Sequence, residues 1–137
     1  MPKTTPAKDH YTFAVGRRKS AVATVKLYSG KGESKVNDQS PVKYFTAVFY
    51  NLQFEKPFEA THTEDKYHYT ATIVGGGKHG QIEALTVALA RALRKDNTDF
   101  VSPLRNAGLV TIDPRVRERR KVGTGGKARR AKQSPKR

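Results

Sequence analysis

The segment KYHYTATIVGGGKHGQIEALTVALARALRK, residues 66–95, contains the two clearest secondary-structure signals of the chain. Alternating side chains over residues 66–74 predict a strand. Tyr67, Tyr69, Ala71 and Ile73 lie on one face of it, opposite His68, Thr70, Thr72 and Val74. Three glycines interrupt the strand, and a helix is predicted from about Gln81 to Lys95 because apolar residues recur at helical spacing. The apolar stripe of this helix comprises Ile82, Leu85, Leu89 and Leu93, with Ala88 and Ala92 beside it.

Upstream of this unit the pattern has period two. Residues 11–15 and 21–28 are predicted as strands, and a third short strand is predicted near residues 34–37. Between the first two lies GRRKS, residues 16–20, which is predicted as a hairpin-like loop. It places three adjacent cations, Arg17, Arg18 and Lys19, at one end of the predicted sheet.

Two further helices are predicted from their start signals. Ser40 followed by Pro41 combines an N-cap residue with a proline at the first helical position, and Val42, Phe45 and Phe49 then recur at helical spacing. Ser102-Pro103 is predicted to start a shorter helix that Gly108 ends. The segment 51–65 stays ambiguous.

The order of these elements predicts an α+β fold, a two-layer α/β sandwich in which helices cover one face of a small sheet. A chain of 137 residues is long enough for one domain with a modest core. We expect a flexible leader over residues 1–10, a globular domain over 11–114 and an extended basic tail over 115–137.

The charge of the chain is concentrated in that tail. The formal net charge is +15, and residues 115–137 contain 11 Lys and Arg against one acid, a net of +10. All twelve Tyr and Phe lie between Tyr11 and Phe100, so the tail has no aromatic residue with which to build a core. Seven of the eleven cations are Arg, whose planar fork matches phosphate oxygens, and this favours a nucleic-acid partner. If roughly eight of these side chains neutralise phosphates, the log–log salt slope of binding is about −6 to −7.

The residues 75–80, GGGKHG, satisfy G-x-G-x-x-G between a predicted strand and a predicted helix. A dinucleotide site requires an acid at the end of a following strand. Asp96 and Asp99 instead follow a helix, and His79 stands where a P-loop needs Ser or Thr. Nucleotide binding is therefore disfavoured, while Lys78 and the backbone N–H groups could meet an RNA phosphate.

Several classes of protein are excluded or disfavoured. The chain has no cysteine, so disulfides and thiolate-bound zinc are excluded. Its four histidines form no metal-ligand pattern, and no catalytic motif is present, so we expect neither enzymatic activity, nor a cofactor, nor a small-molecule substrate. No apolar run has the length of a membrane span, and we expect a cytoplasmic protein without a membrane partner.

Three motifs carry a resemblance to a known family: GRRKSAVATVKL at 16–27, VGGGKHGQIEALTVALARAL at 74–93, and NAGLVTIDPRVRERRKVGTGGKARRAKQSPKR at 106–137. In this order and spacing the chain resembles the small-subunit ribosomal protein nine family. The resemblance implies a fold like the second domain of ribosomal protein five, docked on the head of the small subunit beside neighbouring head proteins. It also implies that the tail runs through ribosomal RNA toward the anticodon stem-loop of the P-site transfer RNA.

Site residues follow from the basic segments and from the resemblance together. The residues expected to bind ribosomal RNA are Arg17, Arg18, Lys19, Lys78, Arg115, Arg117, Arg119, Arg120, Lys121, Lys127, Arg129, Arg130 and Lys132. By position in the family motif, Lys136 and Arg137 are expected to contact the P-site transfer RNA.

Two other classes of function are kept as alternatives. A nucleoid-type DNA-binding protein or nucleic-acid chaperone would also use a basic tail, and competition between duplex DNA and small-subunit RNA would separate it from a ribosomal protein. An enzyme would require a nucleotide at residues 75–80, and the absence of a thermal shift with nucleotides would remove that hypothesis.

Overall fold

The computed structural model describes residues 10–126, 128, 129 and 135 of the chain. It has a four-stranded sheet in the order β1-β2-β4-β3. The strands are β1 (Tyr11–Arg18), β2 (Ala21–Ser29), β3 (Lys35–Val36) and β4 (Tyr67–Val74). β1, β2 and β4 pair antiparallel, and β3 adds to β4 in parallel. The predicted mixture of helices and sheet is confirmed.

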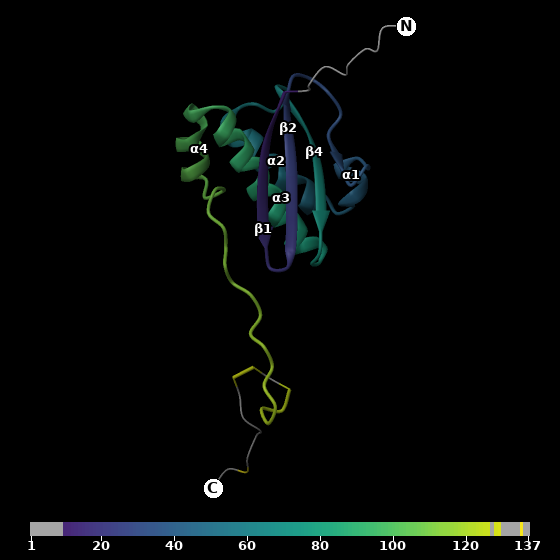
Figure 1. Ribbon diagram of the computed structural model, residues 1–137, viewed down its shortest axis with the longest axis vertical. Helices are drawn as coiled ribbons and strands as arrows, with labels where there is room; N and C mark the ends of the chain where they lie inside the picture. Colours follow the sequence, from purple (N-terminus) through teal and green to yellow (C-terminus); the bar gives the residue numbers. More distant parts are fainter. Residues whose placement is uncertain (1–9, 127, 130–134, 136–137) are drawn as a thin grey trace, which may run out of the picture.

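The helices lie on one side of this sheet (Figure 1). They are α1 (Pro41–Tyr44), α2 (Val48–Thr61), α3 (Lys78–Asp96) and α4 (Val101–Asn106), with a short 3-10 helix (Thr98–Phe100) before α4. α3 packs against β1 and β2, and α2 packs against α3. Among the described residues, no helix covers the opposite face of the sheet (Figure 1).

The core lies between the sheet and α3, where the sequence predicts it. The predicted apolar stripe of α3 is fully buried, and so are the alanines beside it. Tyr69, Ala71 and Ile73 form the buried face of β4, and Ala21, Ala23, Val25 and Leu27 that of β2. At about 25 cal/mol for each Å² of apolar surface removed from water, this interface is the main source of stability of the domain.

The predicted loop over residues 16–20 is wrong, because β1 continues through Arg18 and only Lys19 and Ser20 form the turn. Gly16 permits this continuation. A Cβ atom at Gly16 would lie 2.1 Å from the carbonyl oxygen of Ala84 and 2.6 Å from the backbone nitrogen of Ala88. Glycine at this position therefore lets α3 lie directly on β1, and the glycine that indicates a loop in the sequence is a packing residue.

The helix predicted from Ser40 begins where expected but is only four residues long. The Ser40 hydroxyl accepts a hydrogen bond from the Lys43 N–H at 3.2 Å, which confirms the N-cap. The apolar spacing beyond it does not belong to one helix, because Phe45 is buried while Val42 and Phe49 are exposed. Phe49 belongs to α2.

The ambiguous segment 51–65 is largely α2, which contains Pro57 in its interior. Proline disfavours a helix interior because it lacks an N–H and its ring crowds the preceding turn. Here Pro57 and Phe58 are buried, so packing outweighs the local preference. The periodicity of this segment is too weak to predict that outcome.

Two helix starts differ from the prediction by two or three residues. α3 begins at Lys78 instead of Gln81, directly after the predicted Gly75–Gly77 break, so Gly80 lies inside the helix. α4 begins at Val101, before Ser102-Pro103, and has no side-chain N-cap. Gly108 ends α4 as predicted, with a φ of +69° that favours glycine.

After α4, Leu109 and Val110 still pack against the core. The segment from residue 112 to residue 121 then forms neither helix nor strand and is largely exposed. It leaves the body toward the end of the sheet that holds the β1–β2 turn (Figure 1). Among the described residues, no helix has the length and apolar character needed to span a bilayer.

Candidate nucleic-acid interface

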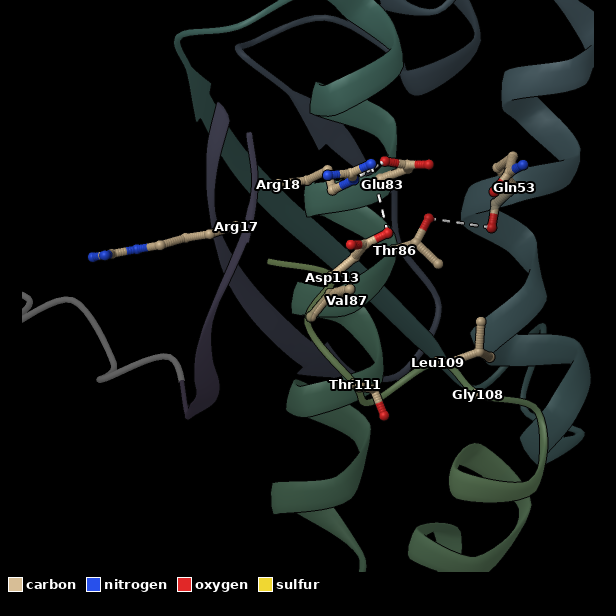
Figure 2. A pocket seen from close by; sticks show the side chains of 10 residues that line it. All are labelled: Arg17, Arg18, Gln53, Glu83, Thr86, Val87, Gly108, Leu109, Thr111 and Asp113. Carbon is tan, nitrogen blue, oxygen red and sulfur yellow. Dashed lines mark hydrogen bonds and ion pairs between the residues drawn. The ribbon is translucent and has the colours of Figure 1, made fainter. Parts of the chain in front are cut away.

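The β1–β2 turn presents its three cations in different ways. Successive side chains of a strand point to opposite faces, so Arg17 and Arg18 diverge. Arg17 is exposed, and Figure 2 shows it directed away from the cluster that contains Arg18. Lys19, in the turn itself, is also exposed. The run of three cations therefore separates into two free side chains and one that faces the helices.

Arg18 is bound to carboxylates within the chain, and its side chain is only 10% exposed. Its Nε donates to Oε2 of Glu83 on α3 at 2.6 Å, and a second guanidinium nitrogen lies 3.5 Å from Oδ2 of Asp113 (Figure 2). The remaining terminal nitrogen, Nη1, donates to the backbone carbonyl of Arg115. Arg18 therefore joins the strand, the helix and the start of the C-terminal segment.

Asp113 is also held by Arg115, the first cation of the C-terminal segment. The Arg115 side chain donates to both carboxylate oxygens, with Nε 3.0 Å from Oδ1 and Nη2 2.6 Å from Oδ2. The Arg115 hydrogen bonds, with a smaller contribution from the charge of Arg18, hold the pKa of Asp113 well below its usual range. The carboxylate thus stays ionised between two guanidinium groups, and it fixes the point at which the chain leaves the body.

A shallow hollow lies beside this cluster, between α2, α3 and the segment after α4 (Figure 2). Arg18, Glu83 and Asp113 line one side, and Gln53, Thr86 and Leu109 the other. Within the part of the chain that the structure describes, no group of three or more His, Asp or Glu could hold a metal ion. The cationic and anionic groups of the hollow neutralise one another, which is typical of a structural anchor.

The glycine-rich loop between β4 and α3 packs against the β1–β2 turn. Gly75 and Gly76 have positive φ angles, and a Cβ atom at Gly75 would lie 2.6 Å from the Ser20 carbonyl oxygen. These two glycines are thus required by the fold. The prediction that Lys78 meets a phosphate is untested, but its Nζ lies 3.4 Å from the centre of the Tyr44 ring and 3.3 Å from the Tyr44 carbonyl oxygen. Lys78 is therefore held against α1 by a cation–π contact.

Most of the cations that are predicted to bind RNA in the described part of the C-terminal segment are exposed. Arg117, Arg119, Arg120 and Lys121 form no ion pair within the described residues. Arg129 pairs with Glu118, its Nε 2.7 Å from Oε2, and hydrogen bonding to Arg129 lowers the pKa of Glu118. The predicted site residues Lys127, Arg130, Lys132, Lys136 and Arg137 lie outside the described residues.

The charge pattern of the sequence identifies the cations but misses the acids that bind three of them, Arg18, Arg115 and Arg129. Asp113 and Glu118 are the only acids after Phe100, and their isolation in a basic stretch is a signal that could have marked them as internal partners. Glu83 lies on the polar side of α3 and gives no such signal. Arg91, Arg94 and Lys95 lie at the other end of α3, and a sequence gives no sign that sets such helical cations apart, because they are common on solvated faces.

Comparison with known proteins agrees with the resemblance. The family model described as ribosomal protein S9/S16 matches residues 16–137. A relative from Desulfotalea psychrophila is 42% identical over 114 residues, covering 83% of this chain and 88% of its own length. One from Ureaplasma parvum is 43% identical over 123 residues, covering 90% and 92%, and one from Methylacidiphilum infernorum is 41% identical over 117 residues, covering 85% and 86%. Each relative is named small ribosomal subunit protein uS9.

Proposed function

The chain belongs to the ribosomal protein S9/S16 family, and we propose that it binds small-subunit ribosomal RNA through its β1–β2 turn and its basic C-terminal segment. Membership makes it a structural component of the small ribosomal subunit and not an enzyme. The proposal concerns which of its surfaces meet RNA and how.

The observation that carries this proposal is the position of the free cations. Arg17 and Lys19 are exposed at one end of the sheet, and the segment that begins at Arg115 runs in that direction (Figure 1). An RNA backbone that follows the segment would meet both groups of cations. Phosphate contacts of this kind supply affinity without sequence specificity.

Arg18 acts differently from its neighbours in this proposal. Its donors are bound to Glu83, Asp113 and the Arg115 carbonyl, so its contribution is to hold the exit of the C-terminal segment. Fixing that exit lowers the conformational entropy lost when the segment binds RNA. The cations that follow then start from a defined place on the body.

The domain boundaries and the end of the C-terminal segment involve residues outside those that the structure describes. We propose a leader over 1–10, a domain over 11–114 that resembles the second domain of ribosomal protein five and docks on the subunit head, and a tail over 115–137. Lys127, Arg130 and Lys132 would continue the phosphate contacts of the described cations. Lys136 and Arg137 would reach the anticodon stem-loop of the P-site transfer RNA.

A charge-matched pair of variants tests the RNA contacts. Replacing Arg117, Arg119 and Arg120 with Gln should make the log–log salt slope of binding to small-subunit ribosomal RNA shallower by about 2 to 3. The control replaces Lys31, Lys43 and Lys56 with Gln, which removes the same charge from exposed positions elsewhere. Equal slopes for the two triple variants would overturn the proposed role of the segment.

A second experiment addresses the end of the chain. Replacing Lys136 and Arg137 with Ala should weaken binding of P-site transfer RNA to assembled small subunits, while the protein still enters the subunit. Co-sedimentation measures entry, and filter binding measures the affinity for transfer RNA. Unchanged affinity in subunits that contain the variant would contradict the proposed contact.

A further inference from the structure

A second group of cations lies at the C-terminal end of α3, away from the β1–β2 turn. A groove there is lined by Phe13, Ala14 and Val15 of β1 and by three cations of α3, Arg91, Arg94 and Lys95. No acid lines it. With a rise of 1.5 Å per residue, Lys95 lies about 18 Å along α3 from Glu83. The groove is thus separate from the cluster around Arg18.

Two of these cations are held by the open edge of the sheet. A terminal nitrogen of Arg91 donates to the Val15 carbonyl at 3.0 Å, and Nζ of Lys95 donates to the Phe13 carbonyl at 2.8 Å. Arginine has five N–H donors and lysine three, so each retains donors for a ligand. Within the described residues, neither these two cations nor Arg94 pairs with a carboxylate.

The same two contacts indicate which partner does not fit. The Phe13 and Val15 carbonyls belong to the outer edge of β1, which another strand would need in order to add to the sheet. Arg91 and Lys95 already bind these carbonyls. Addition of a protein strand is therefore disfavoured, and three cations without an acid favour a polyanion.

Phe13 supplies the apolar part of the site. Its side chain is 45% exposed on the sheet face without helices, directly opposite Lys26 of β2. The Tyr11 ring is engaged by Tyr28, with centroids 5.8 Å apart, and by Lys26 Nζ at 5.1 Å. Among the described residues, the Phe13 ring makes no aromatic or cation–π contact of that kind. The four strands contain no Asp or Glu, so nothing on them repels a phosphate.

We propose that Phe13, Arg91, Arg94 and Lys95 form a second RNA site that takes a single-stranded segment of ribosomal RNA. An unpaired base stacks on the Phe13 ring, and the phosphates beside it meet the three cations. This inference rests on the proposed function, and it adds a surface at the opposite end of α3 from the basic C-terminal segment. The protein then contacts RNA at both ends of its long helix.

A fluorescence experiment tests the stacking directly. The chain has six Tyr but no Trp, so Phe13→Trp introduces a single indole at the proposed contact, and this indole can be excited apart from the tyrosines. Small-subunit ribosomal RNA should quench its emission, because a stacked base lies against the indole ring. Phe49→Trp, at a position 55% exposed on α2, is the matched control and should be quenched less. Equal quenching of the two variants, or quenching by other ribosomal proteins but not by RNA, would overturn the inference.

Measuring the affinity of variants for small-subunit ribosomal RNA distinguishes this site from the C-terminal segment. Phe13→Leu keeps an apolar side chain but loses the ring, and should weaken binding to small-subunit ribosomal RNA by about 5- to 100-fold. Arg94→Gln should make the salt slope shallower by about 0.7, while the control Lys56→Gln leaves it unchanged. If the unsubstituted protein does not bind this RNA, the proposed function itself fails. If it binds and Phe13→Leu and Arg94→Gln bind equally well, only the second site is refuted.

Discussion

The two ends of α3 use the same kinds of residue in opposite ways. At the N-terminal end, Arg18 lies between Glu83 and Asp113, and its charge is neutralised within the chain. At the C-terminal end, Arg91 and Lys95 donate to backbone carbonyls, and among the described residues neither pairs with a carboxylate. Asp96, the residue after Lys95, accepts hydrogen bonds from the hydroxyls of Thr12 and Tyr67, and it forms no ion pair within the described residues.

This difference shows that a cation in a basic protein is available to RNA only if the fold brings no acid to it. Arg17 and Arg18 are adjacent in the sequence, yet one is exposed and the other is held by two carboxylates. An ion pair gains little at an exposed surface, whereas removing one partner of a pair that is withdrawn from water is costly, because it leaves the other charge unpaired. The N-terminal end of α3 thus positions the chain, and the C-terminal end offers charge to a partner.

The largest expected effect comes from separating α3 from β1, because this would disrupt the contacts at both ends of α3 at once. Gly16→Ala places a methyl group 2.1 Å from the Ala84 carbonyl oxygen, and we expect a loss of about 3 kcal/mol in the free energy of unfolding. Gly77→Ala is the control, because nothing lies within 4 Å of its added Cβ, and it should cost less than about 1 kcal/mol. Urea unfolding of both variants measures the difference, and similar stabilities would contradict the close packing.

The next effect concerns the N-terminal end of α3 alone. Arg18→Gln leaves Glu83 and Asp113 without their guanidinium partner, and we expect a loss of about 2 kcal/mol in the free energy of unfolding. Arg17→Gln should change it by less than about 0.5 kcal/mol because Arg17 is exposed. Limited trypsin digestion should also cut Arg18→Gln faster near Arg115. Equal stability and equal digestion of the two variants would show that Arg18 is no anchor.

A smaller, pH-dependent effect is expected from Asp113. Its pKa in the folded protein is lowered by Arg115 and Arg18, so its stabilising contribution is fully present above the ordinary value of 3.8 and is lost as the pH falls through the folded-state pKa. The Tm of the native chain should therefore exceed that of Asp113→Asn at neutral pH, and the gap should narrow below pH 3.8. Thermal melts at several pH values measure it. A gap that does not change with pH would contradict the ionised pairing.

The smallest effect is local to the C-terminal end of α3. Burial, together with the hydrogen bond to Asp96 and its negative charge, raises the pKa of Tyr67 from 10.0 to about 12. Asp96→Asn should lower that pKa but leave it above 10.0, since burial is the largest cause. NMR titration of the Tyr67 ring measures the shift, with Asp99→Asn as control. If both variants leave the pKa of Tyr67 the same, Asp96 is not its partner.

Much of the fold could be predicted because local patterns and packing agree there. The strand over residues 66–74 and the stripe from Ile82 to Leu93 combine clear periodicity with burial on one face. α2 could not be predicted, because Pro57 opposes the helix locally and only burial compensates for it. The loop predicted at Gly16 was wrong because local sequence favours a turn at glycine. The sequence does not reveal that the backbone of α3 lies against this residue.

The sequence by itself determined the family, the buried stripe of α3 and the excess of positive charge at the C-terminal end, since these depend on residue type and spacing. The tertiary structure alone decided which cations are free. Arg18 meets Glu83 across 65 positions of the chain and the Arg115 carbonyl across 97, while Lys95 meets the Phe13 carbonyl across 82. Electrostatic interactions depend on distance in space, and no local pattern encodes a distance between residues so far apart in the sequence.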